Sequence, residues 1–138
     1  MEFFAEDMYR ENIMDHFKNP RNHGVVENPD IGFADNNPLC GDEIGITVKL
    51  NKDKNEKPTI AEIKFNGKGC AISQASASML TEQVVGMRLE DVKKMKTDEV
   101  IKNLGIPLQP IRVKCAILGF KVLEAGIFLY EGKKVSGK

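Results

Sequence analysis

Three cysteines are the residues of this chain best suited to chemistry. Cys40, Cys70 and Cys115 lie 30 and 45 positions apart, and no two of them form a Cys-x-x-Cys pair. In 67-GKGCAISQASASM-79, glycines precede the Cys70 thiol and small Ala and Ser residues follow it. Small neighbours leave the backbone accessible, so a metal ion or a partner's sulfur atom can come close to the Cys70 sulfur. Thiolates attack sulfur and bind soft metals.

A carboxylate stands close to the first cysteine. Asp42 follows Cys40 by two residues in 37-NPLCGDE-43, where a turn can direct the thiol and the carboxylate to one point. Three thiolates and one carboxylate form a four-coordinate set suited to zinc or to an iron–sulfur cluster. The harder carboxylate oxygen binds soft centres less firmly than sulfur does. Such a set predicts a site that can release what it holds.

The elements that must position these residues are predicted from periodicity. Residues 43–50 and 59–66 alternate apolar and polar side chains and are joined by a short polar turn, which predicts an antiparallel hairpin, with a weaker third strand at 31–36. Helical segments are predicted at 6–18, 71–85, 89–95, 97–105 (with Thr97 as N-cap) and 112–130. The prediction is an α+β fold, a small antiparallel three-stranded sheet packed against several helices, as a single domain over 1–138.

Each cysteine then falls at a junction between elements. Cys40 lies in a turn before the first clear strand, Cys70 at the start of the 71–85 helix, and Cys115 near the start of the last helix. Helix N-termini favour thiolate over thiol. The competing interpretations are that the cysteines are small buried hydrophobes and that Asp42 is a turn residue. Three cysteines at three junctions favour a shared site.

Composition excludes several classes of function. The 20 basic and 20 acidic side chains cancel, so no net field favours nucleic acid or an anionic membrane. No apolar run approaches the roughly 20 residues that span a bilayer. The first residues lack a basic region followed by an apolar core, so we expect a cytoplasmic location, where a disulfide framework is not expected.

The two histidines give little support to an alternative enzyme. A cysteine-nucleophile hydrolase needs a histidine to activate its thiol. His16 lies on the apolar face of the first predicted helix and His23 in the loop after it. Both are expected to be structural, so a hydrolase is not favoured.

Four segments, taken in order and spacing, carry a resemblance to a known family. They are 9-YRENIMDHFKNPRNHG-24, 38-PLCGD-42, 67-GKGCAISQASASMLTE-82 and 112-RVKCAIL-118. Over nearly its whole length the chain resembles the IscU/NifU N-terminal family of iron–sulfur cluster assembly scaffold proteins. The resemblance implies an IscU/SufE-like sandwich that is not an enzyme. On it, iron and sulfur from a cysteine desulfurase become a transient [2Fe–2S] cluster for transfer to apo iron–sulfur acceptor proteins.

The resemblance also implies roles for particular residues. Cys40, Cys70 and Cys115 are implied to be cluster ligands and persulfide acceptors, and Asp42 to keep the cluster labile. Lys114 stands where IscU proteins usually have histidine. A charged lysine does not bind iron, so Lys114 is expected to stabilise the Cys115 thiolate or an anionic persulfide.

Lys114 also gives the chain some SufU-like character, because that branch has a basic residue there, binds zinc and relays sulfur. SufU proteins carry an insertion between the second and third cysteines, and the 45-residue separation here is too short to include it. The segment 108-LQPIR-112 departs from the stretch that a dedicated Hsp70-type chaperone reads in the family, so this partner is not expected.

Three alternatives stay open at this point. The first is a zinc-dependent sulfurtransferase that accepts persulfide from a cysteine desulfurase. The second is a purely structural zinc module, although glycine-flanked ligands favour an open site over a closed one. The third concerns the fourth ligand, which is either Asp42 or a residue of a second protomer in a homodimer that shares the cluster.

Overall fold

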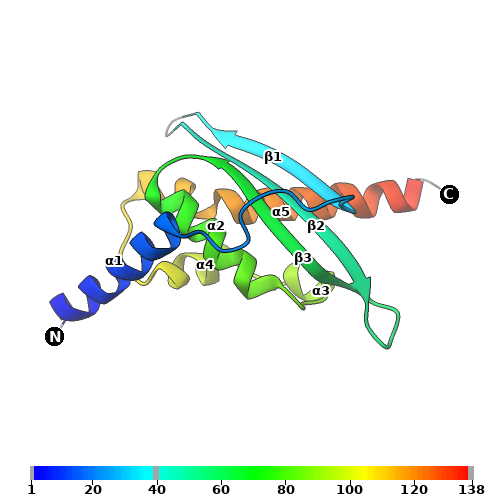
Figure 1. The fold of residues 1–138 in the computed structure, drawn as a ribbon, viewed down its shortest axis with the longest axis horizontal. Coiled ribbons are helices and arrows are strands. Elements are labelled where there is room, and N and C mark those ends of the chain that lie inside the picture. Colours follow the sequence, from blue (N-terminus) through cyan, green and yellow to red (C-terminus); the bar gives the residue numbers. More distant parts are fainter. Residues whose placement is uncertain (1, 39–40, 137–138) are drawn as a thin grey trace.

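In the computed structural model, residues 2–38 and 41–136 are described, with side chains from 10 to 38 and from 41 to 132. The antiparallel sheet has the order β1 (Ile31–Asn37), β2 (Asp42–Lys52) and β3 (Pro58–Lys68). The helices are α1 (Glu2–Lys18), α2 (Ala71–Val84), α3 (Leu89–Val92), α4 (Thr97–Leu104) and α5 (Pro110–Ser136). The helices gather on one side of a curved sheet (Figure 1). The predicted α+β fold with a three-stranded antiparallel sheet is therefore confirmed.

The inner face of the sheet carries most of the core. Ile46 is 2% exposed and pairs with Phe33 of β1 and Phe65 of β3 in one row across the sheet. Ile44 and Val48 flank it at two-residue spacing on the same face and are equally buried. Side chains alternate between the two faces of a strand, so the sequence pattern of β2 fixes which face meets the helices.

Small residues let the two central helices approach each other closely. α2 packs against β3 and α5 packs against β1 and β2, and the two helices also contact each other. A Cβ atom built on Gly119 would lie 3.3 Å from the Cβ of Ala77. Ser76 Oγ donates a hydrogen bond of 2.6 Å to the Ala116 carbonyl across the same interface. Part of the Ser and Ala content after Cys70 thus serves helix packing.

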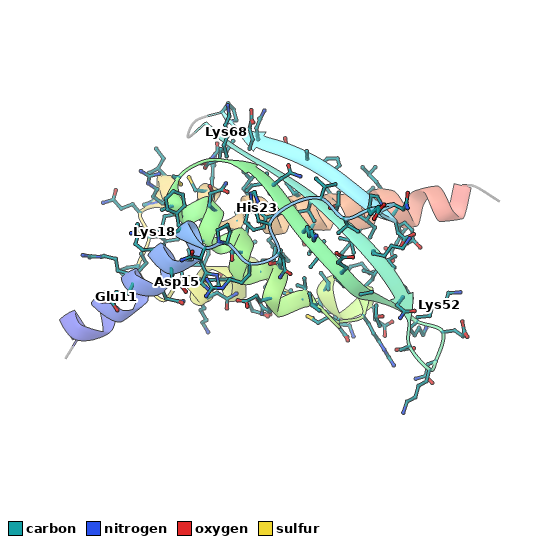
Figure 2. The ribbon with its side chains drawn as sticks, in the orientation of Figure 1. Glu11, Asp15, Lys18, His23, Lys52 and Lys68 are labelled. Carbon is teal, nitrogen blue, oxygen red and sulfur yellow. The ribbon has the colours of Figure 1, made fainter. Side chains whose placement is uncertain are left out.

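A strap, residues 20–30, crosses the outer face of the sheet from β3 to β1 (Figure 1). The Phe65 N–H donates to the Asn22 carbonyl at 2.9 Å and the Gly24 N–H donates to the Phe65 carbonyl at 2.8 Å. His23 lies beside β3 with its ring edge-on to Phe65, at 5.3 Å between centroids (Figure 2). Val26, only 2% exposed, is covered where the strap passes over the sheet. The segment predicted as a loop therefore supplies ladder hydrogen bonds to β3.

His16 is a structural residue of the α1–α2 interface. Its Nδ1 lies 2.8 Å from Ser78 Oγ, which also accepts the Arg21 backbone N–H at 2.9 Å. Burial holds the pKa of His16 below its ordinary value, and the Arg21 charge lowers it further, while Glu82 and Asp15 act in the opposite direction. The ring is therefore favoured in its neutral form.

Three helix starts differ from the sequence prediction. α1 begins at Glu2, four residues earlier than predicted. Thr97 is the first residue of α4, and Lys96 takes the N-cap position without a side-chain hydrogen bond. α5 begins at Pro110, two residues earlier than predicted, because proline suits the first helical position, where its missing N–H is not needed. Among the described residues, no helix is both long enough and apolar enough to cross a membrane.

Candidate metal centre

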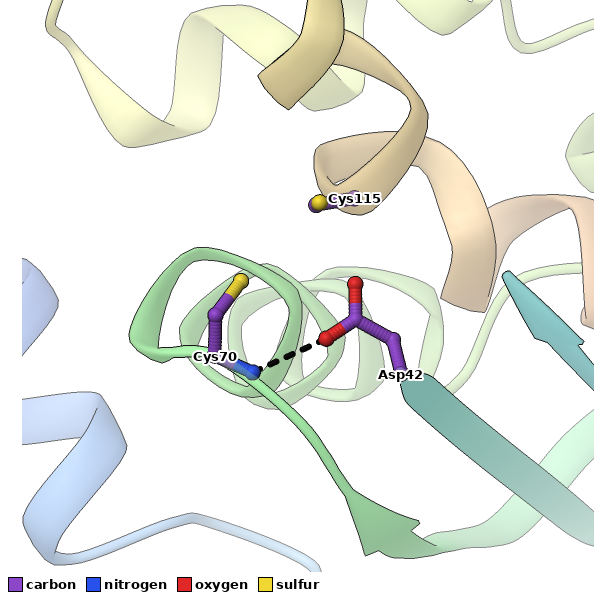
Figure 3. A group of neighbouring side chains, drawn as sticks. All are labelled: Asp42, Cys70 and Cys115. Carbon is purple, nitrogen blue, oxygen red and sulfur yellow. Dashed lines mark hydrogen bonds between the residues drawn. The ribbon is translucent and has the colours of Figure 1, made fainter. Parts of the chain in front are cut away.

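Three of the residues predicted from the sequence come together at one end of the sheet. Asp42 is the first residue of β2, Cys70 immediately precedes α2, and Cys115 lies in the second turn of α5. Their potential ligand atoms, two sulfurs and a carboxylate oxygen, all lie within 4.8 Å of one another (Figure 3). Cys40 lies outside the described residues. The fold thus gathers donors from three elements that are far apart in the sequence.

Asp42 is a buried acid with one unused oxygen. It continues the inward-facing series of Ile44 and Ile46 and is 0% exposed. Its Oδ1 accepts the Cys70 backbone N–H at 2.9 Å, whereas its Oδ2 is buried without a hydrogen-bond partner in the described part of the chain. Leaving a buried carboxylate oxygen unpaired is costly. An oxygen of this kind beside two sulfurs fits a ligand for a metal centre.

Steric crowding explains why a glycine, Gly69, precedes Cys70. A Cβ atom on Gly69 would overlap Asp42 Oδ1 and would lie 2.7 Å from Ser73 Oγ. Ser73 in turn donates to the Cys70 carbonyl at 3.1 Å, and its Oγ lies 3.9 Å from the Cys70 sulfur. Only glycine lets the Asp42 carboxylate reach the start of α2. Gly69 thus leaves space for the Asp42 carboxylate beside Cys70 as well as for an incoming partner.

Cys70 and Cys115 have different settings. Cys70 occupies the N-cap position of α2 with an extended backbone and is half-buried. Cys115 is 0% exposed. Because α5 begins at Pro110, Cys115 lies inside the helix and not at its N-terminus, which corrects the expectation that the helix start would favour its thiolate. Of these two sulfurs, Cys70 is the more accessible.

Lys114 precedes Cys115 on the exposed side of α5. Its side chain makes no hydrogen bond or ion pair with the residues described around the site. Its expected role as a stabiliser of a thiolate or persulfide therefore stays a prediction.

Sequence reasoning missed Asn37, which contacts the site. Asn37 is 8% exposed, and its Nδ2 lies 4.0 Å from the sulfur of Cys115. Asn37 follows Ile31 and Phe33 at even spacing, so it lies on the inner face of β1. A polar residue at an inward position of a strand, three positions before Cys40 in the sequence, was the available signal.

Comparison with known proteins places this chain in one family. Residues 8–136 match the family model described as NifU-like N terminal domain, and the chain belongs to that family. Among its relatives, it is 39% identical to the zinc-dependent sulfurtransferase SufU of Bacillus subtilis (strain 168), over 92% of this chain and 94% of that protein. It is 32% identical to the iron–sulfur cluster assembly scaffold protein IscU of Azotobacter vinelandii, over 91% of this chain and 96% of that protein.

A solved structure shows the same likeness in three dimensions. A putative iron–sulfur cluster assembly scaffold protein for the SUF system from Fervidobacterium islandicum AW-1 superposes with a TM-score of 0.68 at 32% identity. The match covers 85% of this chain and 94% of that one.

The extent of the alignments separates the two kinds of relative. The match to SufU runs over 144 positions but uses 92% of the 138 residues here, about 127, so about 17 positions have no counterpart in this chain. The match to the Azotobacter IscU runs over 129 positions and uses 91%, about 126 residues, which leaves about 3. The chain thus combines higher identity to SufU with the length of IscU.

Proposed function

We propose that this protein is a scaffold on which a transient [2Fe–2S] cluster is assembled from iron and desulfurase-derived sulfur and then passed to apo-proteins. The observation that carries the proposal is the convergence of the unpartnered Asp42 carboxylate oxygen with the sulfurs of Cys70 and Cys115. Cys40 completes a four-ligand set by its position two residues before Asp42. The names of the IscU relatives support the same function.

The two described cysteines suggest a division of labour. Cys70 is half-buried, and small residues surround it, so a desulfurase persulfide can reach its sulfur. The Cys70 thiolate attacks the outer sulfur of that persulfide, one S–S bond forms, and the old S–S bond breaks with release of the desulfurase thiolate. Cys115 is fully buried and acts as a fixed ligand. Reduction of the transferred sulfur to sulfide requires an external electron donor.

Asp42 accounts for release of the product. Its oxygen is a harder donor than sulfur and holds an iron–sulfur centre less firmly. The Cys70 N–H fixes the other carboxylate oxygen, so Asp42 can leave the iron without leaving its place in the fold. A site with one weak ligand on a rigid support suits a protein that gives up its cluster.

The proposal is tested on protein purified anaerobically. Iron, zinc and acid-labile sulfide are measured on the same sample whose visible spectrum is recorded. Reconstitution with ferrous iron, cysteine, a cysteine desulfurase and a reductant should give near-equal iron and sulfide and absorption near 400 nm. Replacing Cys40, Cys70 or Cys115 singly with serine should abolish the colour. A protein that takes up no sulfide under these conditions would contradict the scaffold.

A zinc-dependent sulfurtransferase is the second candidate, and the 39% identity to SufU favours it. The same four ligands suit a tetrahedral zinc ion. In that function these residues would hold zinc, which would favour the thiolate form of its cysteine ligands, and one of those cysteines would accept persulfide from a cysteine desulfurase. About one zinc per chain, no sulfide and no colour after reconstitution would select this function.

The expected role of Lys114 can be tested in the second candidate function. In the sulfurtransferase, the Lys114→Ala variant should slow persulfide transfer from the desulfurase, measured with a radiolabelled cysteine substrate. The matched control is Lys52→Ala, an exposed lysine at the far end of the β2–β3 hairpin (Figure 2). Equal transfer rates in the two variants would remove Lys114 from the mechanism.

A further inference from the structure

We propose that Asn37 is a positioning residue of the metal centre, whose side-chain amide donates a hydrogen bond to the Cys115 sulfur when that sulfur binds the metal. The inference rests on the proposed metal-binding function and adds a residue that supports the ligands without being one. Three observations carry it: the burial of Asn37, the direction of its amide and the bond made by its backbone carbonyl.

The side chain of Asn37 lies on the inner face of the sheet beside the ligands. Asn37 is the last residue of β1 and pairs directly with Asp42 in the β1–β2 ladder. Asn37 is 8% exposed, and asparagine is rarely buried unless its side chain makes hydrogen bonds. Its Nδ2 stands 4.0 Å from the Cys115 sulfur, at the long end for an N–H donor and a sulfur acceptor.

The backbone of the same residue holds the turn that leads to Asp42. The Asn37 carbonyl accepts the Gly41 N–H at 2.9 Å, which ties the end of β1 to the residue that precedes β2. Gly41 has a φ of +70°, a left-handed conformation that glycine adopts at little cost. Asn37 therefore connects, through two different groups, the turn between the strands and the sulfur on α5.

A hydrogen bond to a metal-bound thiolate has two effects. It fixes the direction in which the sulfur presents its lone pairs, and it withdraws electron density from them because the acceptor is charged. Because an amide does not ionise, it can donate this hydrogen bond over the whole pH range in which the protein folds. Residues that hold ligands in this way change metal affinity by about 10–100-fold when they are replaced.

The test uses Zn²⁺ and Co²⁺ as probes of the full-length reduced protein. Asn37→Leu and Asn37→Val both remove the donor, add no metal ligand and leave the backbone bond to Gly41 in place. Each should weaken Zn²⁺ binding, measured by competition with a chelator, by about 10–100-fold. Each should also move the sulfur-to-cobalt charge-transfer band to longer wavelength, because the sulfur electrons are no longer stabilised. The matched control, Asn36→Val, alters an exposed side chain one position away and should change neither.

A double-mutant cycle assigns the effect to one sulfur. In a Cys115→Ala background, which leaves no hydrogen-bond acceptor at this position, Asn37→Leu should change Co²⁺ affinity by less than twofold. A band and an affinity unchanged in both Asn37 variants would overturn the inference, and so would an effect of equal size in the Cys115→Ala background. If Asn37→Leu does not fold, the smaller Asn37→Val variant decides. A wild-type protein that shows no sulfur-to-cobalt band would reject the metal site itself, which is a different failure.

Discussion

Removing the charge of Asp42 should make the metal-free protein more stable. In the Asp42→Asn variant, the amide oxygen can still accept the Cys70 N–H, now at Oδ1 of Asn. The amide nitrogen replaces the carboxylate oxygen that has no partner and faces the two sulfurs as a donor. A buried polar atom left unsatisfied costs about 1–3 kcal/mol, and more when it is charged. We therefore expect the free energy of unfolding to rise by at least about 1 kcal/mol.

The same substitution should reduce the stabilisation that metal gives. A ligand present at 100 times its dissociation constant adds about 2.7 kcal/mol to the stability of the folded state. Each tenfold loss of affinity removes about 1.4 kcal/mol of that gain. A neutral amide oxygen is a weaker donor to zinc or iron than a carboxylate, so the order of stability should reverse: Asp42→Asn above wild type without metal and below it with metal.

Urea denaturation of the reduced protein, with a chelator and then with excess Zn²⁺, measures both effects. Glu43→Gln is the matched control, since it removes the same charge one residue away at an exposed position. It should shift neither free energy by more than about 0.5 kcal/mol. A metal-free Asp42→Asn protein less stable than wild type would show that the carboxylate is satisfied in the folded state, and the argument from its unpartnered oxygen would be refuted.

Three further predictions follow from the packing. Gly69→Ala should destabilise the protein by about 1–3 kcal/mol, measured in urea, and abolish Zn²⁺ binding, because the new methyl group overlaps the Asp42 carboxylate. The control Gly132→Ala places its methyl group in open space on α5 and should instead stabilise the protein by up to about 1 kcal/mol. Equal effects of the two substitutions would contradict the steric argument. Because burial lowers the pKa of His16 from 6.5, the unfolded chain binds a proton that the folded chain does not, so the urea midpoint should fall as the pH drops from 7.5 to below 6. That fall should be smaller in His16→Gln, and an identical pH profile would exclude His16 as its source. Ser76→Ala should lower the free energy of unfolding by about 1 kcal/mol through loss of the bond to the Ala116 carbonyl; an unchanged urea midpoint would show that this bond adds nothing.

The sheet could be predicted almost residue by residue because its pattern is local. Alternation alone located 43–50 and 59–66, which extend in the structure to Asp42–Lys52 and Pro58–Lys68. The weaker segment 31–36 became β1 because pairing with β2 supplies the hydrogen bonds that its own composition does not predict. The helices bounded by breakers were placed closely, but α1 begins four residues before the predicted start and α5 ends six residues beyond the predicted end.

The interior of the site could be predicted only in part. Residue types and spacing indicated Asp42, Cys70 and Cys115, but not that an aspartate oxygen would hold the Cys70 N–H or that Gly69 would make room for it. Those contacts join residues about thirty positions apart and depend on the angle at which α2 leaves β3. The buried setting of Cys115 was missed because Pro110 starts the helix a turn before it.

The strap has a consequence for how copies of this protein can associate. Asn22 and Gly24 bind the backbone N–H and C=O of Phe65 on the outer edge of β3. Another chain would otherwise use these two groups to pair with β3. Among the described residues, no strand pairs with the opposite edge of the sheet, along β1. Open edges are templates for aggregation, and continuous fibres need one at each side of every copy. Edge-to-edge association of this sheet would therefore end at a pair joined through β1 and would not propagate into a filament.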